Sequence, residues 1–213
     1  MNCTLCRTPL LNKRDEYFYD CSRCKAIVKD DVFYITPEEE KARYETHNND
    51  IHDVRYQDFT SPITNYVLEN FTPEHKGLDF GSGTGPVISS MLTENSYNIV
   101  QYDSFFAPDK RIFDDKYDYI VACEVFEHFH NPKMEIERLT SLLEANGTML
   151  IMTMLYNDKI AFKSWNYRND LTHVFIYRKE TIEYLANKNN LDIEIMTGRF
   201  IVLKNTSKTS QSN

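Results

Sequence analysis

The stretch Leu78-Asp79-Phe80-Gly81-Ser82-Gly83-Thr84-Gly85-Pro86 decides the fold of this chain. It has the pattern of a buried strand ending in an acidic residue, then a glycine-rich turn and a proline that suits the first position of a helix. Glycine lacks a Cβ and tolerates positive φ, so the backbone of such a turn can pass close to a bulky ligand. The helix N-terminus adds free N–H groups and a positive dipole end. Because no Gly-Lys-Ser/Thr follows, the turn is not predicted to be a phosphate-binding P-loop.

Strands and helices are predicted to alternate from Ser61 onward. One expected helix begins at Ser61-Pro62, and three more cover 86–94, 132–146 and 181–188. The expected strands cover 76–80, 98–103, 117–125 and 148–154, and a hairpin of 192–196 and 199–204 follows. Near-continuous apolar strands that alternate with helices predict an α/β, Rossmann-like sheet, mostly parallel and covered on both faces, to which the hairpin adds an antiparallel strand. In such sheets ligands bind beyond the carboxyl ends of the strands.

Four of the five cysteines form two Cys-x-x-Cys pairs near the N-terminus, Cys3-Thr4-Leu5-Cys6 and Cys21-Ser22-Arg23-Cys24. Each pair can aim two sulfurs at one point, and two pairs complete a tetrahedral thiolate site that suits Zn²⁺. Disulfides are disfavoured without a secretion signal, and a redox motif needs only one such pair. We therefore expect residues 1–35 to form a zinc ribbon with a structural metal, closed by a strand at 32–35. The fifth cysteine, Cys123, is expected to be a small core residue.

The region between the ribbon and the α/β part, 36–60, is expected to hold a linker helix over 37–47, because Thr36-Pro37 followed by three glutamates is typical of a helix start. The segment 46–60 has no clear periodicity. It is interpreted either as a lid over the ligand site or as a plain surface linker. The α/β domain then covers 61–204, and the polar tail 205–213 is expected to be disordered.

Composition and net charge argue against some classes of function. The formal net charge of −8 argues against tight, non-specific binding of nucleic acid, which needs clustered Lys and Arg. No stretch approaches the roughly 20 apolar residues that span a bilayer, and the N-terminus lacks an apolar signal-peptide core. A cytoplasmic protein is expected.

Taken together, residues 61–204 resemble the class I S-adenosylmethionine (SAM) dependent methyltransferases. The likeness rests on the glycine loop, on the acid Asp103 after the second strand, on Tyr117-Asp118-Tyr119-Ile120-Val121 and on Glu124-Val125-Phe126-Glu127-His128. The last stretch is similar to that of methyltransferases that modify quinone precursors. Domain order alone, with the ribbon first, is similar to that of a bacterial ribosomal-RNA guanine methyltransferase family.

This resemblance assigns roles to the loop and to the acid after the second strand. Asp79 and the backbone of Gly81, Ser82 and Gly83 would face the methionine part of SAM. Asp103 would accept hydrogen bonds from the two ribose hydroxyls, for which the two oxygens of a carboxylate are suited.

One departure from the family pattern follows Asp103, because only thirteen residues separate it from Tyr117. The family usually places a helix and a third strand there, so this unit must be shortened or lost. Phe105, Phe106 and Pro108 are expected to pack against the adenine instead; the alternative is that the two phenylalanines are simply core.

A first group that can serve the chemistry is Glu124-x-x-Glu127-His128-x-His130. At helical spacing Glu124, Glu127 and His128 would share one face and could hold a divalent metal that orients a catechol-like or enediol substrate. The alternative, which we favour, is that Glu124 lines the pocket below the SAM sulfonium and His128 caps loops. His128 is kept as a catalytic candidate.

A second group lies in Trp165-Asn166-Tyr167-Arg168-Asn169-Asp170-Leu171-Thr172-His173-Val174, after the fifth strand and so near the pocket mouth. His173 is the predicted base, oriented by Asp170, with Trp165 and Tyr167 walling a planar substrate. The alternative is a structural loop in which His173 caps the next strand.

The sequence thus predicts a SAM-dependent methyltransferase with structural zinc, acting on a small aromatic, quinone-like or sugar-like acceptor. Two alternatives remain open: an RNA methyltransferase, and a non-catalytic protein in which the ribbon docks a partner and SAM only stabilises the fold.

Overall fold

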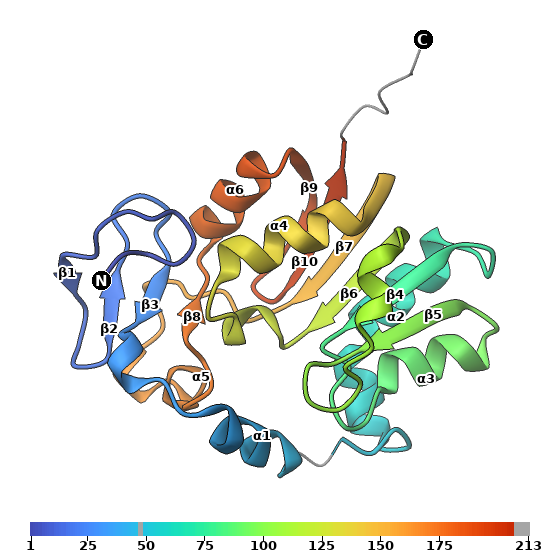
Figure 1. Ribbon diagram of the computed structural model, residues 1–213, viewed down its shortest axis with the longest axis horizontal. Coiled ribbons are helices and arrows are strands. Elements are labelled where there is room, and N and C mark those ends of the chain that lie inside the picture. Colours follow the sequence, from blue (N-terminus) through green and yellow to red (C-terminus); the bar gives the residue numbers. More distant parts are fainter. Residues whose placement is uncertain (47–48, 207–213) are drawn as a thin grey trace.

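The computed structural model describes residues 1–46 and 49–206. Figure 1 shows a small N-terminal unit beside a larger α/β unit, with the helix α1 (Pro37–Glu45) running below both. Thr36 caps α1 through a reciprocal capping box with Glu39, and Pro37 takes the first helical position. The helix was expected from the same residues over 37–47; its start at Pro37 is confirmed, it ends at Glu45, and residue 47 lies outside the described residues.

The larger unit is built on a six-stranded sheet of order β5-β4-β6-β7-β10-β9. Its strands are β4 (Lys76–Phe80), β5 (Asn98–Tyr102), β6 (Tyr117–Cys123), β7 (Leu143–Met152), β9 (Leu191–Met196) and β10 (Phe200–Asn205). The pairings among β5, β4, β6 and β7 are parallel, whereas β10 runs antiparallel to both β7 and β9. The predicted Rossmann-like sheet with an antiparallel closing hairpin is confirmed.

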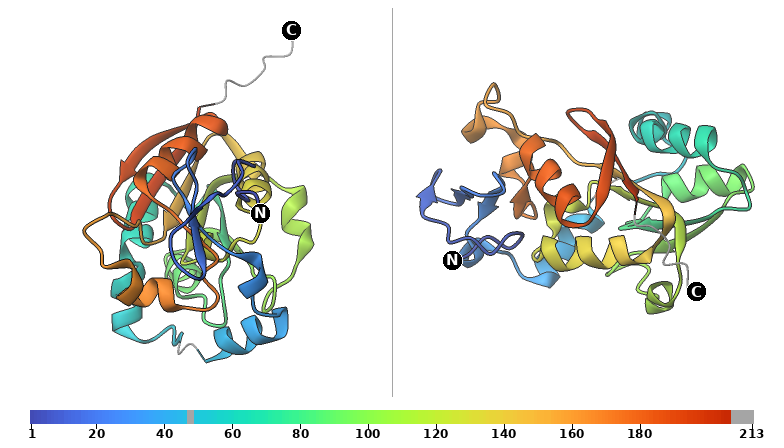
Figure 2. Two further views of the ribbon diagram at one scale, coloured as in Figure 1. Left: turned by 90° about the vertical axis from the view of Figure 1, so that its left-hand side faces the viewer. Right: turned by 90° about the horizontal axis from the view of Figure 1, so that it is seen from above.

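Helices cover both faces of this sheet, as Figure 2 shows. On one face α2 (Val54–Asn70) and α3 (Val87–Glu94) bury Ile63 and Leu92 in one cluster with β-strand side chains. On the other face α4 (Pro132–Leu142) and α6 (Lys179–Lys188) bury Ile136 and Leu185 in a second cluster. The core therefore forms two layers, one on each side of the sheet.

The third strand of the family pattern is absent from the described chain, because residues between β5 and β6 form only the short 3-10 helix η2 (Lys110–Asp114) and an isolated bridge between Asp103 and Ala107. The expected shortening is confirmed, and β5 becomes an edge strand of the sheet.

The start of α2 was predicted wrongly. The helix begins at Val54, capped by Asp53, and continues through Pro62. Proline cannot donate to the carbonyl four residues earlier, but the Ser61 hydroxyl donates to that carbonyl of Asp58 at 2.7 Å. The neighbouring hydroxyl thus satisfies the acceptor that the proline leaves, so Ser61-Pro62 does not mark a helix start.

The small unit is a four-stranded sheet of order β1-β2-β3-β8. Its strands are β1 (Asn12–Lys13), β2 (Phe18–Asp20), β3 (Ile27–Lys29) and β8 (Phe175–Ile176), the last from the far end of the chain. The strand expected at 32–35 is wrong: Asp30 caps a 3-10 helix, Asp31–Phe33, and ends the extended run.

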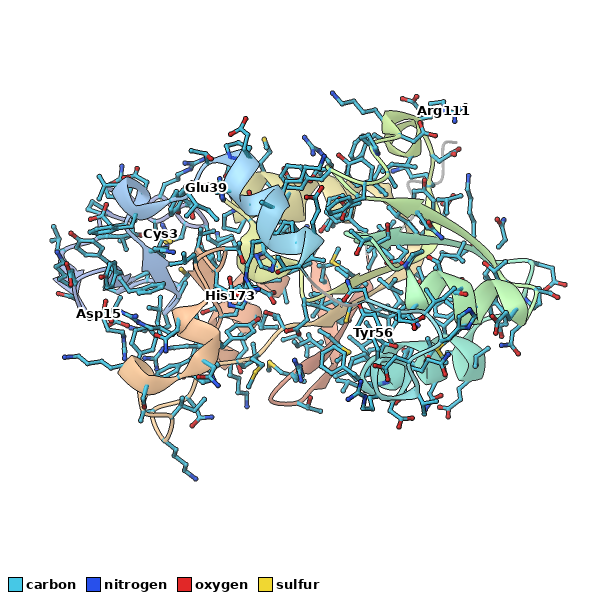
Figure 3. The ribbon with its side chains drawn as sticks, turned by 90° about the horizontal axis from the view of Figure 1, so that it is seen from below. Cys3, Asp15, Glu39, Tyr56, Arg111 and His173 are labelled. Atoms are coloured by element: carbon cyan, nitrogen blue, oxygen red, sulfur yellow. The ribbon has the colours of Figure 1, made fainter. Side chains whose placement is uncertain are left out.

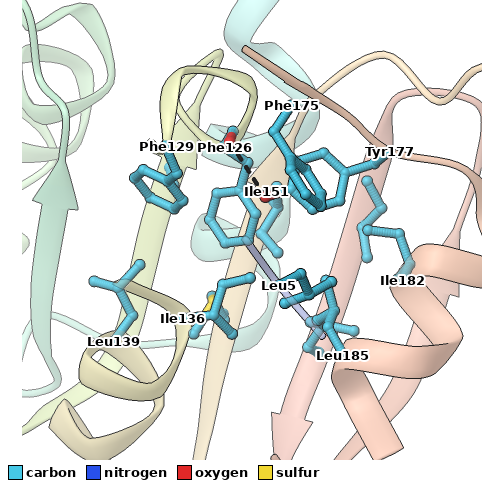
Figure 4. Close-up of a cluster of buried hydrophobic side chains, with 14 of the residues drawn as sticks. Leu5, Phe126, Phe129, Ile136, Leu139, Ile151, Phe175, Tyr177, Ile182 and Leu185 are labelled. Atoms are coloured by element: carbon cyan, nitrogen blue, oxygen red, sulfur yellow. Dashed lines mark hydrogen bonds between the residues drawn. The ribbon is translucent and has the colours of Figure 1, made fainter. Parts of the chain in front are cut away.

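The two units share one hydrophobic cluster. Figure 4 shows Leu5 of the small unit among Phe126, Ile182 and Leu185 of the large one. Asn205, assigned to the tail from sequence, ends β10, and the rest of the predicted disordered tail from 207 lies outside the described residues. Within residues 1–46 and 49–206, no helix is long and apolar enough to cross a membrane.

Candidate active site

A cavity of about 660 Å³ opens at the carboxyl ends of β4, β5 and β6. The glycine loop, Asp103 and Glu124 line it from the sheet, where ligands of open α/β folds bind. Glu40 and Tyr44 of α1 line it from the linker. In Figure 3 His173 lies beside α1, between the small unit and the sheet. The cavity therefore joins residues of the linker helix with residues of the α/β unit.

The glycine loop has the backbone that its sequence predicts. Gly81 and Gly83 have φ of +80° and +65°, a region that L side chains rarely adopt, and a Cβ on Gly81 would overlap the Val125 side chain. The N–H groups of Gly81 and Ser82 donate to the carbonyl of Tyr102 at 2.7 and 3.1 Å. The hydroxyl of Ser82 is buried without a hydrogen-bond partner among the described residues. It is free to bind a ligand in the cavity that Ser82 lines.

Asp79 does not face the cavity, contrary to the expectation. Its carboxylate lies under α3, where it accepts a hydrogen bond from the Ser89 hydroxyl at 2.6 Å. Burial raises its pKa to about 6. Side chains of a strand alternate between faces, so the residue before Phe80 points to the α3 side and supports the loop from beneath.

Asp103 lines the cavity as expected, and it also braces both neighbouring segments. One carboxylate oxygen accepts from the N–H groups of Phe105 and Phe106 at 2.8 and 3.1 Å. The other accepts from the Gly83 N–H at 3.0 Å. Both phenylalanines are half-buried and line the cavity, whereas Pro108 is exposed and does not.

Glu124 lines the cavity from a residue with unusual backbone geometry, φ of +53°. The Arg199 guanidinium donates to both of its oxygens at 3.3 and 3.2 Å. Burial and the neighbouring Glu127 nevertheless raise the pKa of Glu124 to about 7. Cys123, expected in the core, is half-buried and lines the same wall.

The favoured interpretation of the stretch 124–130 agrees with the structure, because Glu124 lines the cavity and His128 is hydrogen-bonded to the carbonyl of Thr172 in a loop. The alternative trio of Glu124, Glu127 and His128 is not assembled, because the chain forms a 3-10 helix over Phe126–His128 and Glu124 pairs with Arg199. The structure instead gathers Glu127, His128 and His173, whose ligand atoms lie within 4.8 Å of one another.

Each histidine of this group donates through Nδ1 to a backbone carbonyl. His128 donates to Thr172 at 3.1 Å and His173 to Tyr167 at 2.7 Å. Because a carbonyl only accepts, Nε2 of each ring carries the lone pair. Burial lowers both pKa values, that of His173 to about 3, so both rings are neutral at pH 7. Both histidines line the cavity.

Glu127 lies fully buried behind them. One of its oxygens accepts from Thr153 at 2.9 Å, and the other has no hydrogen-bond partner within the described residues. Burial raises its pKa to about 7. An unpartnered buried carboxylate oxygen beside two imidazole lone pairs favours a bound proton or a cation.

The loop that carries His173 is arranged differently from the expectation. Asp170 lines the cavity, but its carboxylate accepts from Thr172 and Arg43 rather than from the His173 ring. Burial opposes ionisation of Asp170, but these hydrogen bonds hold its pKa well below the usual range. The Tyr167 carbonyl, not Asp170, therefore orients His173.

Trp165 and Tyr167 do not wall the cavity. Trp165 packs at the edge of an aromatic cluster with Phe162 and Tyr156, and Tyr167 is buried with its hydroxyl 2.8 Å from that of Thr153. A stretch rich in aromatic residues can form core as easily as a binding wall, and sequence alone does not separate the two.

The four N-terminal cysteines converge on one point, as predicted. All four are buried, their Sγ atoms lie within 4.8 Å of one another, and the pairs Cys3–Cys24 and Cys6–Cys21 lie 3.6 and 3.3 Å apart. These separations are too long for disulfides. They are close to those of thiolates around one tetrahedral ion.

Both knuckles fold alike. After each Cys-x-x-Cys, Arg7 and Lys25 adopt φ of +62° and +63°. Their N–H groups donate to the carbonyls of Cys3 and Cys21 at 2.9 and 3.1 Å. Two superposable turns that aim all four sulfurs inward are typical of a zinc ribbon.

Several cavity residues were missed from sequence. Tyr44 places its ring edge-on to His128, and Asn49 lies against the glycine loop, where a Cβ on Gly85 would overlap the Asn49 carbonyl. Arg199, which pairs with Glu124 but does not itself line the cavity, stacks on the cavity residue Phe59, with its guanidinium carbon 4.2 Å from the ring centroid. No local motif marks these residues, because each reaches the site from a distant segment.

A family model described as "Methyltransferase domain" matches residues 51–194. Among solved structures, the chain is similar to the 1,6-didemethyltoxoflavin-N1-methyltransferase of Burkholderia thailandensis, solved with 1,6-didemethyltoxoflavin and S-adenosylhomocysteine. The TM-score is 0.58 at 12% identity, over 88% of this chain and 98% of that one. It is also similar to magnesium protoporphyrin IX methyltransferase from Synechocystis PCC 6803 with bound SAH, at TM-score 0.52 and 12% identity, over 79% and 93% of the two chains.

An O-methyltransferase family protein from Burkholderia thailandensis matches with a TM-score of 0.53 and 15% identity over 80% of this chain, which spans 64% of that protein. No curated protein matches this sequence. At these identities the likeness to solved structures concerns the fold.

Proposed function

This chain belongs to the methyltransferase-domain family and is a SAM-dependent methyltransferase, and we propose that its methyl acceptor is a small molecule held in the cavity beside His128 and His173. The observation that carries the proposal is that one cavity holds both the glycine loop and two neutral imidazoles with free lone pairs.

The residues of the loop side fit SAM. Gly81 has no side chain that would crowd the loop against Val125, and the buried Ser82 hydroxyl has no hydrogen-bond partner among the described residues. Asp103 has carboxylate lone pairs left for the ribose, and Phe105 offers an aromatic face for the adenine. When bound, SAM supplies an electrophilic methyl group on a positive sulfonium, and Glu124 would provide the matching negative charge.

On the acceptor side we assign proton removal to His173, with His128 beside it. The Tyr167 carbonyl fixes the His173 tautomer, so Nε2 can take a proton from the hydroxyl or amine that receives the methyl group. Asp170 holds the loop through Thr172 and Arg43. In-line transfer needs the two reactants aligned, which the cavity walls provide.

Charge favours a small acceptor over RNA. Among the described residues that line the cavity, one is a permanent cation, Arg138. Five are acidic: Glu40, Asp103, Glu124, Glu135 and Asp170. A phosphate backbone needs positive charge. The 1,6-didemethyltoxoflavin-N1-methyltransferase, similar in fold, was solved with bound 1,6-didemethyltoxoflavin, which supports a small-molecule acceptor.

A labelled-methyl transfer assay over aromatic, quinone-like and sugar-like acceptors tests the proposal. The wild type should transfer the labelled methyl group to acceptors of one class. The rate of transfer should fall at least tenfold in His173→Gln, because loss of a general base lowers the rate by about 10²–10⁴-fold. The control is His52→Gln on the surface. SAH binding with no transfer to any acceptor or RNA would leave the non-catalytic interpretation.

A divalent cation is the second occupant that the acceptor side suits, because Glu127 has an unpartnered oxygen beside two imidazole lone pairs. A lone pair that binds a cation cannot take a proton, so the two roles exclude each other. Measuring the metal content of the purified protein separates the two roles. One bound metal per chain supports His173 as the base, and a second bound metal that is lost in Glu127→Gln supports a cation at this group.

For the ribbon we propose one structural Zn²⁺ bound by the four cysteines, supported by their burial and convergence. Four protein ligands leave no open position for catalysis. Purified protein should hold one zinc per chain, and Cys21→Ser should lose it. Zinc retained in that variant would place the metal elsewhere.

A further inference from the structure

The strand that follows His173 belongs to the sheet of the ribbon. β8 pairs antiparallel with β3, with Ile27 opposite Ile176 and Val28 opposite Phe175. Throughout the described chain, β8 joins none of the strands of the central sheet. The segment that carries His173 into the cavity is therefore anchored, on its C-terminal side, in the ribbon.

Lys29, the last residue of β3, holds the same segment twice. Its N–H donates to the Val174 carbonyl at 2.9 Å, directly after His173. Its side chain crosses to donate from Nζ to the Leu171 carbonyl at 2.7 Å, and the residue is only 4% exposed. A buried ammonium fixed on a backbone carbonyl is costly to displace, because the carbonyl would lose its partner.

Asp15 of the ribbon holds the other side of the loop. One of its oxygens accepts from Arg168 Nη2 at 2.6 Å, and the other accepts from the N–H groups of Tyr17 and Phe18. The two charged side chains are 6% and 15% exposed, so water screens this pair little. The Arg168 guanidinium also stacks over the Tyr17 ring, with its carbon 5.0 Å from the centroid.

These anchors flank the group that orients the imidazole. Tyr167, whose carbonyl accepts from His173 Nδ1, directly precedes Arg168. Leu171, held by Lys29, lies two residues before His173. The Asp15–Arg168 pair thus holds the acceptor side of the hydrogen bond that sets the direction of Nε2, and Lys29 holds the donor side.

We propose that the ribbon is a structural part of the acceptor site, in which Asp15 and Lys29 are positioning residues for His173. The proposal rests on the proposed role of His173. It predicts that ribbon changes disturb the His173 loop and methyl transfer while SAH binding at the glycine loop stays intact.

The test uses the full chain with its metal. Lys29→Met keeps the apolar stem and removes the donor to Leu171, and Asp15→Asn removes the charge that pairs with Arg168. Matched controls on the ribbon surface are Lys13→Met and Asp31→Asn, both exposed and away from the cysteine knuckles. Lys29→Arg keeps a cationic donor and serves as the conservative rescue.

Three readouts are compared across these variants. The first is hydrogen–deuterium exchange of 166–176 against 76–83. The second is the imidazole Cε1–H NMR signal of His173, assigned with His173→Gln. The third is the affinity for SAH. We expect faster exchange in 166–176 and a shifted His173 signal in Lys29→Met and Asp15→Asn, no change in the controls, and a signal close to wild type in Lys29→Arg.

With an acceptor in hand, kcat should fall tenfold or more while the KM for SAM is unchanged, since a displacement of about 1 Å can cost 10²-fold. Unchanged exchange and an unchanged His173 signal in both anchor variants would overturn the proposal. Normal turnover in His173→Gln would instead overturn the role of His173, and the exchange data would still show whether the ribbon holds the loop.

Discussion

Three carboxyl groups around the cavity are buried without full compensation, and each has a raised pKa: Asp79 near 6, and Glu124 and Glu127 near 7. Burial disfavours their charged forms. A bound sulfonium would favour those forms again through its positive charge. Glu124, the one of the three that lines the cavity and is assigned to the sulfonium, therefore costs stability when SAM is absent.

The pH dependence of the free energy of unfolding, compared between wild type and Glu127→Gln, measures the cost of burial at Glu127. The pKa of Glu127 rises from 4.5 to about 7 on folding, so between these values the folded state binds more protons than the unfolded state. The free energy of unfolding of the ligand-free wild type should then fall relative to that of the variant as pH rises from 4.5 to 7, by up to about 1.4 kcal/mol per pH unit. Denaturant unfolding of both proteins at pH 5 and 8 measures this, with Glu137→Gln on the surface as control. A difference that is constant with pH would show that Glu127 folds with an ordinary pKa.

Asp103→Asn tests the ribose assignment. The amide keeps the shape but loses the charge that accepts from the ligand and from the Gly83 N–H. SAH affinity should fall about 10- to 100-fold, the value of hydrogen bonds to a charged group. Asp109→Asn, on the exposed side of the same loop, should leave it unchanged. Equal SAH affinity in Asp103→Asn and wild type would remove the ribose role.

Single residues were predictable where one short motif fixes their surroundings. Glycines with positive φ and the two Cys-x-x-Cys turns are set by their own backbone, so the loop and the cysteine cluster match the prediction. Asp170 and Asp79 were placed wrongly, because their partners Arg43 and Ser89 are chosen by packing. The partner of Glu124, Arg199, lies 75 residues away and carries no local signal.

The covering of the cavity belongs to the scale of elements. Residues from Asn49 onward and the first turns of α2 bring Tyr56 and Phe59 to the cavity. The predicted lid over 46–60 stays a prediction, and its residues 47–48 lie outside the described chain. The close approach of Asn49 to Gly85 is what such a cover would need.

Gly85→Ala should move the segment that contains Asn49 away from the glycine loop. The added Cβ would overlap the Asn49 carbonyl, so the segment or the loop must move. Overpacking of this kind costs about 1–3 kcal/mol, and SAH should dissociate at least several-fold faster. Stopped-flow dissociation measures it. Gly198→Ala is the matched control, because nothing lies within 4 Å of its added Cβ. Identical dissociation rates for both variants would mean that 49–59 does not retain the ligand.

The mostly parallel sheet with helices on both faces followed from the alternation of apolar strands and helices along the chain, since a parallel sheet needs both faces covered. The start of α2 did not follow, because a serine hydroxyl replaces the hydrogen bond that Pro62 lacks. The pairing of β8 with β3 could not be predicted either, because strands of two and three residues, more than a hundred positions apart, leave no periodic pattern.

At the scale of the whole molecule, the linker helix and the methyltransferase domain line one cavity, and the ribbon packs behind its His173 loop. α1 supplies Glu40 and Tyr44, and the ribbon sheet holds the loop of His173. The ribbon is therefore packed against the acceptor side and is not a separate module on a tether. The boundaries 1–35, 36–60 and 61–204 remain a proposal for how the chain divides.

Calorimetric titration of the zinc-loaded protein with S-adenosylhomocysteine tests the central claim most directly. The glycine loop, the free Ser82 hydroxyl and Asp103 predict one site per chain with micromolar affinity, within the usual range for enzyme ligands. Absence of binding would contradict the account, because it would show that the shortened segment after Asp103 no longer forms a cofactor site.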